Sequence, residues 1–246
     1  MAKHISRSHQ DPSHLWLWGI HACKAALQNS KRHCFRLLMT ESAAKDLSLS
    51  REALSCKIEI LDSAGLARVL PPSAVHQGIA MEVGPLPVVS MDELFKVNAG
   101  VLVVLDQVTD PHNVGAILRT ARALGALGVM ITDRNAPPLG GVLAKAASGA
   151  LDDLPLWQVT NLARTLDELR KVGFWTVGLD EQAPKVISKV DLPEKIALIM
   201  GAEGEGLRRL TQEKCDFLTR LPTDPTFPTL NVSIATALAL YELIRT

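Results

Sequence analysis

Residues 101–105 read Val-Leu-Val-Val-Leu, an unbroken apolar run that leads directly into the polar stretch Asp-Gln-Val-Thr-Asp-Pro-His-Asn of residues 106–113. Such a run is typical of a strand that is buried on both faces of a parallel sheet. Four similar runs follow, at residues 128–132, 156–159, 174–179 and 196–200. Patterns with helical spacing lie between them, at residues 113–125, 139–149 and 161–172. This alternation predicts an α/β domain with a mainly parallel sheet over residues 99–246.

The chain before this sheet predicts a second, smaller α/β unit over residues 16–83. Its expected helices cover residues 19–28, 41–54 and 63–70, and its expected strands cover residues 34–39, 57–61 and 78–83. Asp62 can cap the third helix, which Pro71 and Pro72 would end. Residues 84–98, with Pro85 and Pro87, predict a linker that ends in a short helix. Residues 1–15 are expected to be a mobile basic tail.

Composition limits the class of protein. Of the 246 residues, 47% are hydrophobic and 21% are charged, which fits a chain with a substantial core. No apolar run approaches the roughly 20 residues of a membrane span, and the first residues lack the apolar segment of a secretory signal. We therefore expect a cytoplasmic protein with no membrane partner.

The net charge is zero, but positive charge gathers near the N-terminus. Residues 1–36 hold six Lys or Arg against a single acid, Asp11. A local excess of this kind can contact phosphate, and a solvated tail would explain it equally well.

Cysteine and histidine spacing gives no sign of a metal site. The four cysteines form no C-x-x-C pair, and no histidine stands at ligand spacing from them, so we expect free thiols and no metal. His4, His9 and His14 recur every five residues, which fits one face of neither a helix nor a strand.

Three segments of the second unit, here called the polar segments, look too specialised for core packing. In the first, over residues 106–121, Pro111 and Asn113 can begin a helix on which Arg119 lies about two turns further along. Arg119 could reach a phosphate or a carboxylate from there. Simple capping by Asn113 and a surface salt bridge of Arg119 remain open as alternatives.

The second segment, residues 199–209, reads Ile-Met-Gly-Ala-Glu-Gly-Glu-Gly-Leu-Arg-Arg. Glycines directly after a buried strand indicate a tight turn or a close ligand. The dinucleotide pattern G-x-G-x-x-G fails, because Arg209 stands where its third glycine would be. A dinucleotide-binding oxidoreductase is therefore disfavoured.

The third segment, residues 221–235, leads into the last expected helix, which Asn231 or Thr229 can cap. Its loop contains three prolines and is therefore stiff. A stiff loop can offer backbone groups to a ligand at little cost in conformational entropy. A long connection with no role in binding would have a similar sequence.

Together and in this order, the three segments resemble the SpoU family of RNA ribose 2′-O-methyltransferases, within the SPOUT class. N-x-G-x-x-x-R-T-A from residue 113, G-A-E-G-E-G-L from residue 201 and L-N-V-S-x-A from residue 230 are similar to its three motifs. Upstream, W-G-I-H-A at residues 18–22 and V-H-Q-G-I at residues 75–79 resemble the small L30e-like RNA-binding domain of the branch that modifies large-subunit rRNA. The likeness covers nearly everything from residue 16 onward.

The resemblance implies a C-terminal domain with a trefoil knot that pairs as a homodimer through its last helix. It implies S-adenosyl-L-methionine as cofactor, bound largely by backbone at Gly201, Leu221 and Leu230, with S-adenosyl-L-homocysteine as product. The implied substrate is a ribose 2′-hydroxyl, that of a guanosine, in ribosomal RNA or a pre-ribosomal particle.

The resemblance also assigns catalytic positions. Arg119 matches the family's essential arginine, and because guanidinium resists deprotonation we expect it to grip a phosphate rather than to act as a base. His112 is a second candidate base that we rank below Arg119. The remaining matches, which we expect to hold the geometry, are Asn113, Glu203, Asn231 and Ser233.

One segment departs from the family. Its third loop is usually rich in Gly and Ser, whereas this chain has Pro225, Phe227 and Pro228, and Thr229 replaces the usual Ser. Two alternatives therefore accompany the expected rRNA enzyme. One is a tRNA ribose 2′-O-methyltransferase, and the other is a catalytically silent RNA-binding ribosome assembly factor.

Overall fold

The computed structural model describes residues 14–46 and 56–245. The expected tail up to residue 13, with His4 and His9, and residues 47–54 of the expected second helix lie outside the described residues. Within the described part, no helix is long and apolar enough to cross a membrane. All four cysteines are free thiols, as predicted. Burial raises the pKa of Cys23 and of Cys215 to about 12 each, which keeps both protonated.

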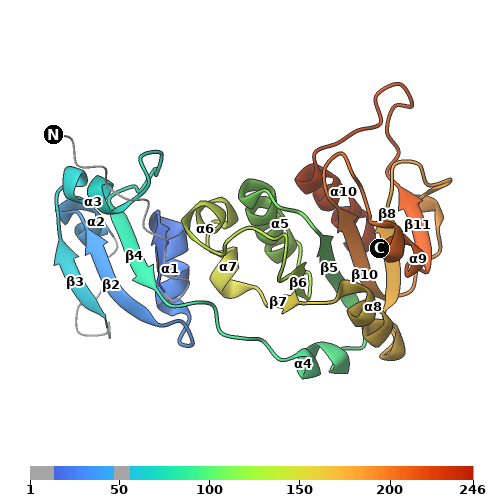
Figure 1. Cartoon of the computed structure of the whole chain (residues 1–246), viewed down its shortest axis with the longest axis horizontal. Coiled ribbons are helices and arrows are strands. Elements are labelled where there is room, and N and C mark those ends of the chain that lie inside the picture. The colour runs from blue at the N-terminus through green and yellow to red at the C-terminus, as the bar shows by residue number, and fades with distance from the viewer. Residues whose placement is uncertain (1–13, 47–55, 246) are drawn as a thin grey trace.

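The N-terminal part is built on a four-stranded sheet with the order β1-β4-β2-β3 (Figure 1). Its strands are β1 (Leu15–Trp18), β2 (Cys34–Met39), β3 (Lys57–Ile60) and β4 (Ile79–Val83). β4 runs antiparallel to β1 and β2, whereas β2 and β3 are parallel. Its helices are α1 (Ile20–Gln28), α2 (Glu41–Asp46) and α3 (Ser63–Val69).

Helices α1 and α3 cover opposite faces of this sheet. Ala22 and Ala26 of α1 share a core with Leu17, while Leu66 of α3 packs with Trp18, the next residue along β1. Successive side chains of a strand point to opposite faces, which is why neighbouring residues serve different helices. Asp62 caps α3 as expected, since its side chain accepts a 2.7 Å hydrogen bond from the backbone N–H of Gly65.

The C-terminal part is a seven-stranded sheet in which every pair is parallel, as predicted, with the order β7-β6-β5-β10-β8-β11-β9. Its strands are β5 (Gly100–Asp106), β6 (Gly128–Thr132), β7 (Leu156–Val159), β8 (Trp175–Leu179), β9 (Lys185–Val186), β10 (Lys195–Gly201) and β11 (Phe217–Arg220). The apolar run at 101–105 lies near the middle, fully buried between β6 and β10.

Helices cover both faces of this sheet and explain why its central strands are apolar (Figure 1). One face packs against α5 (Pro111–Ala123) and α10 (Val232–Ile244), and α6 (Gly141–Ala147) and α7 (Ala150–Asp153) pack in turn against α5. The other face packs against α4 (Met91–Lys96) and α8 (Leu162–Lys171). Two short helices complete the part, η2 (Ile187–Lys189) and α9 (Arg209–Glu213).

The structure differs from the sequence prediction in several details. The helix expected over 139–149 ends at residue 147, because Ser148 and Gly149 are both left-handed, with φ of 51° and 99°. α7 then begins as a separate turn. β9, β11, η2 and α9 were not predicted, since each has five residues or fewer and lacks a clear apolar period.

The two sheets are joined through α6 and α7, which pack against β1 and α1. The first residue of α6, Gly141, lies against the indole ring of Trp18. Deeper in the contact, the amide of Asn29 donates to the carboxylate and the backbone carbonyl of Asp152, each at 3.3 Å. The guanidinium of Arg32 lies 3.7 Å from the same carboxylate, and both side chains are almost fully buried.

The contact between Gly141 and Trp18 predicts a strong effect of one methyl group. In Gly141→Ala the new Cβ would overlap the Trp18 ring, which cannot swing away from the core as a flexible side chain could. Overpacking costs about 1–3 kcal/mol and exceeds the helix preference of alanine over glycine, about 1 kcal/mol. We expect Gly141→Ala to lower the free energy of unfolding by about 1–2 kcal/mol in urea titrations.

Gly140→Ala is the matched control, because a Cβ there meets open space and its φ of −112° suits any residue. Gly140 is the N-cap of α6, so a loss of about 0.5 kcal/mol is expected there. Equal losses in the two variants would contradict the packing described.

Candidate active site

The first two polar segments begin side by side at the carboxyl ends of β5 and β10. These strands pair in parallel with Asp106 directly opposite Gly201. Carboxyl ends of parallel strands are where open α/β sheets bind their ligands. The register therefore brings together two segments that lie almost a hundred residues apart.

A buried ion pair fixes the loop that follows β10. Asp106 is fully buried, and its Oδ1 accepts a 2.7 Å hydrogen bond from Arg208 Nε and lies 2.6 Å from Nη2 of the same guanidinium. Its Oδ2 accepts a 3.2 Å hydrogen bond from the backbone N–H of Arg208. Asp106 was not among the predicted site residues. An acid at the last position of an otherwise apolar strand was the signal, because a buried carboxylate requires a partner.

The loop between Gly201 and Arg208 is a tight turn. Ala202 and Gly206 exchange both backbone hydrogen bonds, at 3.1 Å and 2.8 Å, and Gly204 and Gly206 are left-handed. A side chain at Gly201 would overlap the backbone of Gly206 and Leu207. The glycines are therefore needed to close the turn on itself and to expose Glu203 at its tip.

A chain of side-chain hydrogen bonds joins all three polar segments. The Asn113 amide donates to Glu203 Oε2 at 3.3 Å, and its carbonyl oxygen accepts from Asn231 Nδ2 at 3.0 Å. Asn231 Oδ1 in turn accepts from the Ser233 hydroxyl at 2.6 Å and from its backbone N–H at 2.9 Å. Four of the five predicted catalytic positions thus lie in one connected group.

The capping alternative for Asn113 is wrong. Asp110 caps α5 by accepting from the backbone N–H of His112 at 2.9 Å, with Pro111 as the first helical residue. Asn113 lies within the first turn, 8% exposed, and its side chain points to the second and third segments. The sequence predicted Asn231 or Thr229 as the cap of the last helix. Asn231 is the residue that caps α10.

The third segment contributes a structured loop before α10. Asp224 accepts hydrogen bonds from the backbone N–H and the hydroxyl of Thr226, which lower the pKa of its carboxyl group below the ordinary value. Leu221 is buried in the core that also contains Met200 and Val232, whereas Leu230 is 41% exposed beside Asn231. Of the expected cofactor positions, Gly201 thus lies two residues from Glu203 and Leu230 lies next to Asn231, whereas Leu221 is part of the core.

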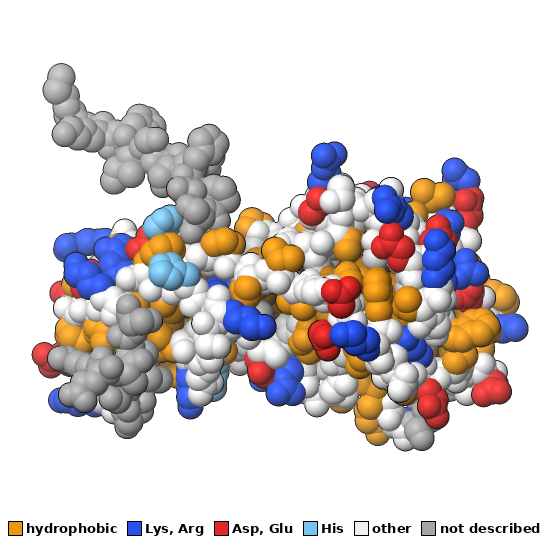
Figure 2. Space-filling view, turned by 90° about the horizontal axis from the view of Figure 1, so that it is seen from below, with side chains coloured by type: hydrophobic (Ala, Val, Ile, Leu, Met, Phe, Trp, Pro, Cys, Tyr) orange, Lys and Arg blue, Asp and Glu red, His pale blue; other side chains and the backbone are white. Residues whose placement is uncertain are grey.

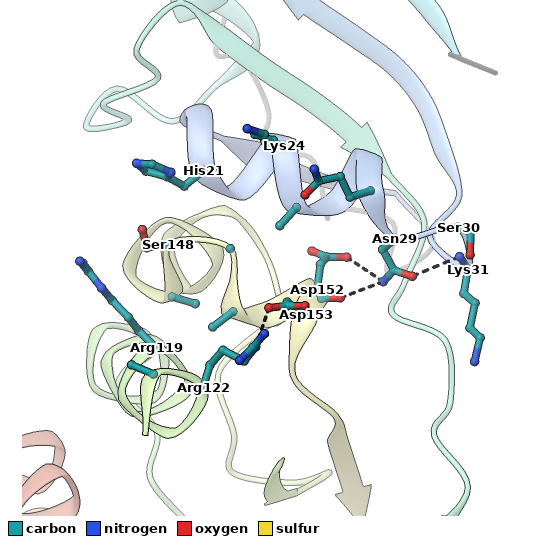
Figure 3. A pocket seen from close by; sticks show the side chains of 16 residues that line it. His21, Lys24, Asn29, Ser30, Lys31, Arg119, Arg122, Ser148, Asp152 and Asp153 are labelled. Atoms are coloured by element: carbon teal, nitrogen blue, oxygen red, sulfur yellow. Dashed lines mark hydrogen bonds and ion pairs between the residues drawn. The ribbon is translucent and has the colours of Figure 1, made fainter. Parts of the chain in front are cut away.

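Arg119 lies apart from the hydrogen-bonded group. It is exposed on α5, and within the described residues no carboxylate is at ion-pair distance from it, which disfavours the surface salt bridge. Its side chain lines a cleft of about 720 Å³ between α1, α5 and α7, where it extends from α5 toward the helix turn at Ser148 (Figure 3). His112 is exposed at the start of α5.

A family comparison accounts for this combination of motifs. The SpoU rRNA Methylase family matches residues 100–241, more than half of the chain. The chain belongs to the SpoU family. A second family, described as RNA 2′-O ribose methyltransferase substrate binding, matches residues 16–89.

Relatives of the SpoU chain match it over almost its whole length. The 23S rRNA (guanosine-2′-O-)-methyltransferase RlmB of Pseudomonas putida is 39% identical, over 93% of this chain and 95% of the relative. The protein of the same name from Shewanella oneidensis is 38% identical, over 93% and 96%. Among solved structures, the SpoU methyltransferase AviRb from Streptomyces viridochromogenes has a TM-score of 0.80 at 22% identity, covering 95% of this chain and 89% of that one. This last likeness supports the fold.

Metal ligands do not gather in the described part of the chain, where no group of three or more His, Cys, Asp or Glu residues could hold an ion. The site is instead made of amides, hydroxyls, one carboxylate and tightly turned backbone. Such groups orient and hydrogen-bond a polar ligand but supply no strong nucleophile.

Replacing two glycines of the turn by alanine should lower the free energy of unfolding by different amounts. Gly201→Ala would force backbone atoms of Gly206 and Leu207 to move, so we expect a loss of about 2–3 kcal/mol in unfolding free energy. Gly204→Ala meets open space and incurs only the strain of a φ of 81°, about 1 kcal/mol. Chemical denaturation of both variants measures the difference, and a smaller loss for Gly201→Ala than for Gly204→Ala would contradict the turn geometry.

Proposed function

We propose that this chain transfers a methyl group from S-adenosyl-L-methionine to the 2′-hydroxyl of a guanosine ribose in large-subunit rRNA. The observation that carries the proposal is the hydrogen-bonded chain Glu203–Asn113–Asn231–Ser233, which ties the three family motifs together. The relatives that match over the whole chain are 23S rRNA (guanosine-2′-O-)-methyltransferases, which favours this substrate over tRNA.

Backbone at Gly201, Leu221 and Leu230 is assigned to the cofactor. Gly201 lies two residues before Glu203 and Leu230 directly before Asn231, both members of the hydrogen-bonded group, and Leu221 lies in the core at the start of the third segment. A tight glycine turn and a proline-rich loop are suited to binding through backbone groups, since both are ordered before the ligand arrives. The cofactor supplies a methyl group already activated on a sulfonium sulfur.

The protein's own contribution is mainly alignment. Holding two reactants in line can supply about 7–11 kcal/mol of a reaction barrier, whereas general-base assistance adds about 10²–10⁴-fold. Asn113, Glu203, Asn231 and Ser233 hold the loops in register, and Arg119 grips the phosphate beside the target ribose. A guanidinium suits this role because it forms two parallel hydrogen bonds to phosphate.

We assign the C-terminal loops to a trefoil knot. In the strand order, β11 is separated from β10 by β8, yet α10, which follows β11, packs against α5, β5 and β10. The segment over residues 221–231 must therefore return across the end of β10. That path beside the turn at 201–207 is what a knot of these two loops requires.

The tail expected over 1–15 is one residue too long or more, because Leu15 already lies in β1. The domains are assigned as a tail that ends before Leu15, an L30e-like RNA-binding domain from β1 to residue 83, a linker over 84–98 and a SPOUT methyltransferase domain over 99–246. The separate four-stranded sheet and the substrate-binding family match at 16–89 support this division. The protein acts in the cytoplasm, on ribosomal RNA or an assembling particle.

Residues on one face of α10 support a homodimer. Ile234, Leu238 and Tyr241 recur at spacings of four and three residues and are 53%, 48% and 58% exposed. Apolar residues on the opposite side of α10, such as Val232 and Ala239, are buried in the chain's own core. An exposed apolar helix face of this kind is suited to a second copy of the chain.

The function is tested by incubating the protein and labelled S-adenosyl-L-methionine with unmodified 23S rRNA or with unmodified tRNA. We expect label in 23S rRNA at one guanosine, resistant to alkaline cleavage because its 2′-oxygen is methylated. Label in tRNA alone would establish the tRNA alternative. Cofactor binding or RNA binding without transfer to either RNA would establish a silent assembly factor.

Arg119→Lys separates a phosphate grip from a simple positive charge. Lysine keeps the charge but loses the paired geometry, so we expect kcat/KM for methyl transfer to fall about 10²-fold, equivalent to about 2.7 kcal/mol. Arg164→Lys is the control, since Arg164 is an exposed arginine on α8, which covers the other face of the large sheet. Near-normal transfer by Arg119→Lys in steady-state assays would contradict the grip.

Leu238→Glu tests the dimer. A carboxylate in an apolar interface is left without water or partner, so we expect the variant to sediment as a monomer where the unaltered protein sediments as a dimer. Val88→Glu, at a residue 99% exposed in the linker, should leave the dimer intact. An unaltered protein that is monomeric in analytical ultracentrifugation would contradict this assignment.

A further inference from the structure

The cleft at Arg119 is formed by both parts of the chain. From the N-terminal part come His21, Lys24 and Lys31, at α1 and the loop after it, and from the C-terminal part come Arg119 and Arg122 of α5. Figure 3 shows Arg119 near one end of the cleft and Lys31 near the other, with Lys24 on α1 above. The cationic side chains are thus spread along the cleft rather than gathered at one point.

The charges of this cleft are not balanced. Its lining contains two acids, and both have partners: Asp153 pairs with Arg122 at 2.6 Å, and Asp152 is held by Asn29 and Arg32. Within the described residues, neither Lys24 nor Lys31 has a carboxylate at ion-pair distance. Over the C-terminal part of the face in Figure 2, by contrast, Lys and Arg side chains are interspersed with Asp and Glu.

The two walls of the cleft are held at a fixed separation. A Cβ at Gly149 would lie 3.2 Å from the backbone carbonyl oxygen of His21, so the turn before α7 approaches α1 closely. Beneath it, the buried contacts of Asp152 with Asn29 and Arg32 tie α7 to the end of α1. The backbone that carries Lys24 and Lys31 is therefore held at a fixed distance from α5, which carries Arg119.

We propose that this cleft binds the ribose-phosphate backbone of a single-stranded RNA segment next to the target nucleotide, with Lys24 and Lys31 contacting phosphates on the side opposite Arg119. The proposal rests on the function proposed above and adds the path of the substrate. The cleft has a volume of about 720 Å³, within the range of about 300–1,000 Å³ that is typical of ligand pockets. A cleft of this size suits a short single strand rather than a duplex. Unpaired RNA is also the form in which enzymes recognise a particular nucleotide.

An RNA strand on this path would contact both parts of the chain, and the two sets of contacts have different effects. Arg119 alone can hold one phosphate, and a single contact leaves the strand free to rotate about it. Phosphate contacts fix the register and orientation of a nucleic acid without reading its sequence. Lys24 and Lys31 would supply the second and third points that orient the target ribose toward the hydrogen-bonded group at Asn113.

The test compares Lys24→Ala/Lys31→Ala with the control Lys96→Ala/Lys171→Ala, whose lysines lie on α4 and α8 at the opposite face of the large sheet. The affinity for an unmodified 23S rRNA transcript is measured by filter binding over a range of KCl concentrations. Each phosphate contact to a single strand contributes about 0.7 to the slope of log Kd against log salt. We expect the cleft variant to lose about 1.4 from this slope and to bind more weakly, and the control to lose neither.

A second variant, Lys24→Arg/Lys31→Arg, should keep the slope, because arginine also contacts phosphate. Since all four replaced lysines are exposed, the melting temperature should stay nearly the same in every one of these variants. Calorimetry with S-adenosyl-L-methionine should give the same affinity throughout. An unchanged slope and affinity in the alanine pair would overturn the proposal.

The outcome is separable from that of the proposed function. If the unaltered protein transfers no methyl group but its RNA affinity depends on Lys24 and Lys31 as described, the cleft stands and the enzymatic function fails. If it methylates 23S rRNA and the lysines do not affect binding or its salt slope, the function stands and the cleft fails.

Discussion

One carboxamide group holds the site together. Asn113 donates from its nitrogen to Glu203 and accepts at its oxygen from Asn231, so a single buried side chain connects the segments after β5, after β10 and before α10. A buried amide left with an unmet donor or acceptor costs about 1–3 kcal/mol, which makes the two contacts mutually dependent. Few other side chains can do this, since a carboxylate cannot donate and an aliphatic group can do neither.

The large sheet creates the conditions for that contact. Parallel pairing of β5 with β10 sets Asp106 beside Gly201, and the Asp106–Arg208 pair then holds the glycine turn over the end of the sheet. α5 leaves the same edge and carries Asn113 in its first turn and Arg119 about two turns further on. The helix therefore connects the loops that we assign to the cofactor with the cleft that we assign to RNA.

Local signals predicted much of this arrangement, and contacts distant in sequence were the part that could not be predicted. Apolar runs indicated the central strands, and Asn231 at the start of an apolar helix indicated its own role as a cap. The order of the motifs, read through the family resemblance, gave Asn113 and Glu203 as site residues, but not that they bond to each other across 90 positions. Lys24 gave no signal beyond a basic N-terminal stretch, because its position opposite Arg119 depends on how α7 packs against α1.

The most direct measurement of the central claim is a double-mutant cycle on Asn113 and Asn231, read out as the binding free energy of S-adenosyl-L-methionine by calorimetry. Asn113→Ala, Asn231→Ala and the double variant are compared with the unaltered protein. If one amide contact holds the loops in register for the cofactor, the losses are not additive, and the coupling energy is about 0.5–3 kcal/mol. Losses that add to within about 0.3 kcal/mol would mean that the two residues act independently, and would contradict this account.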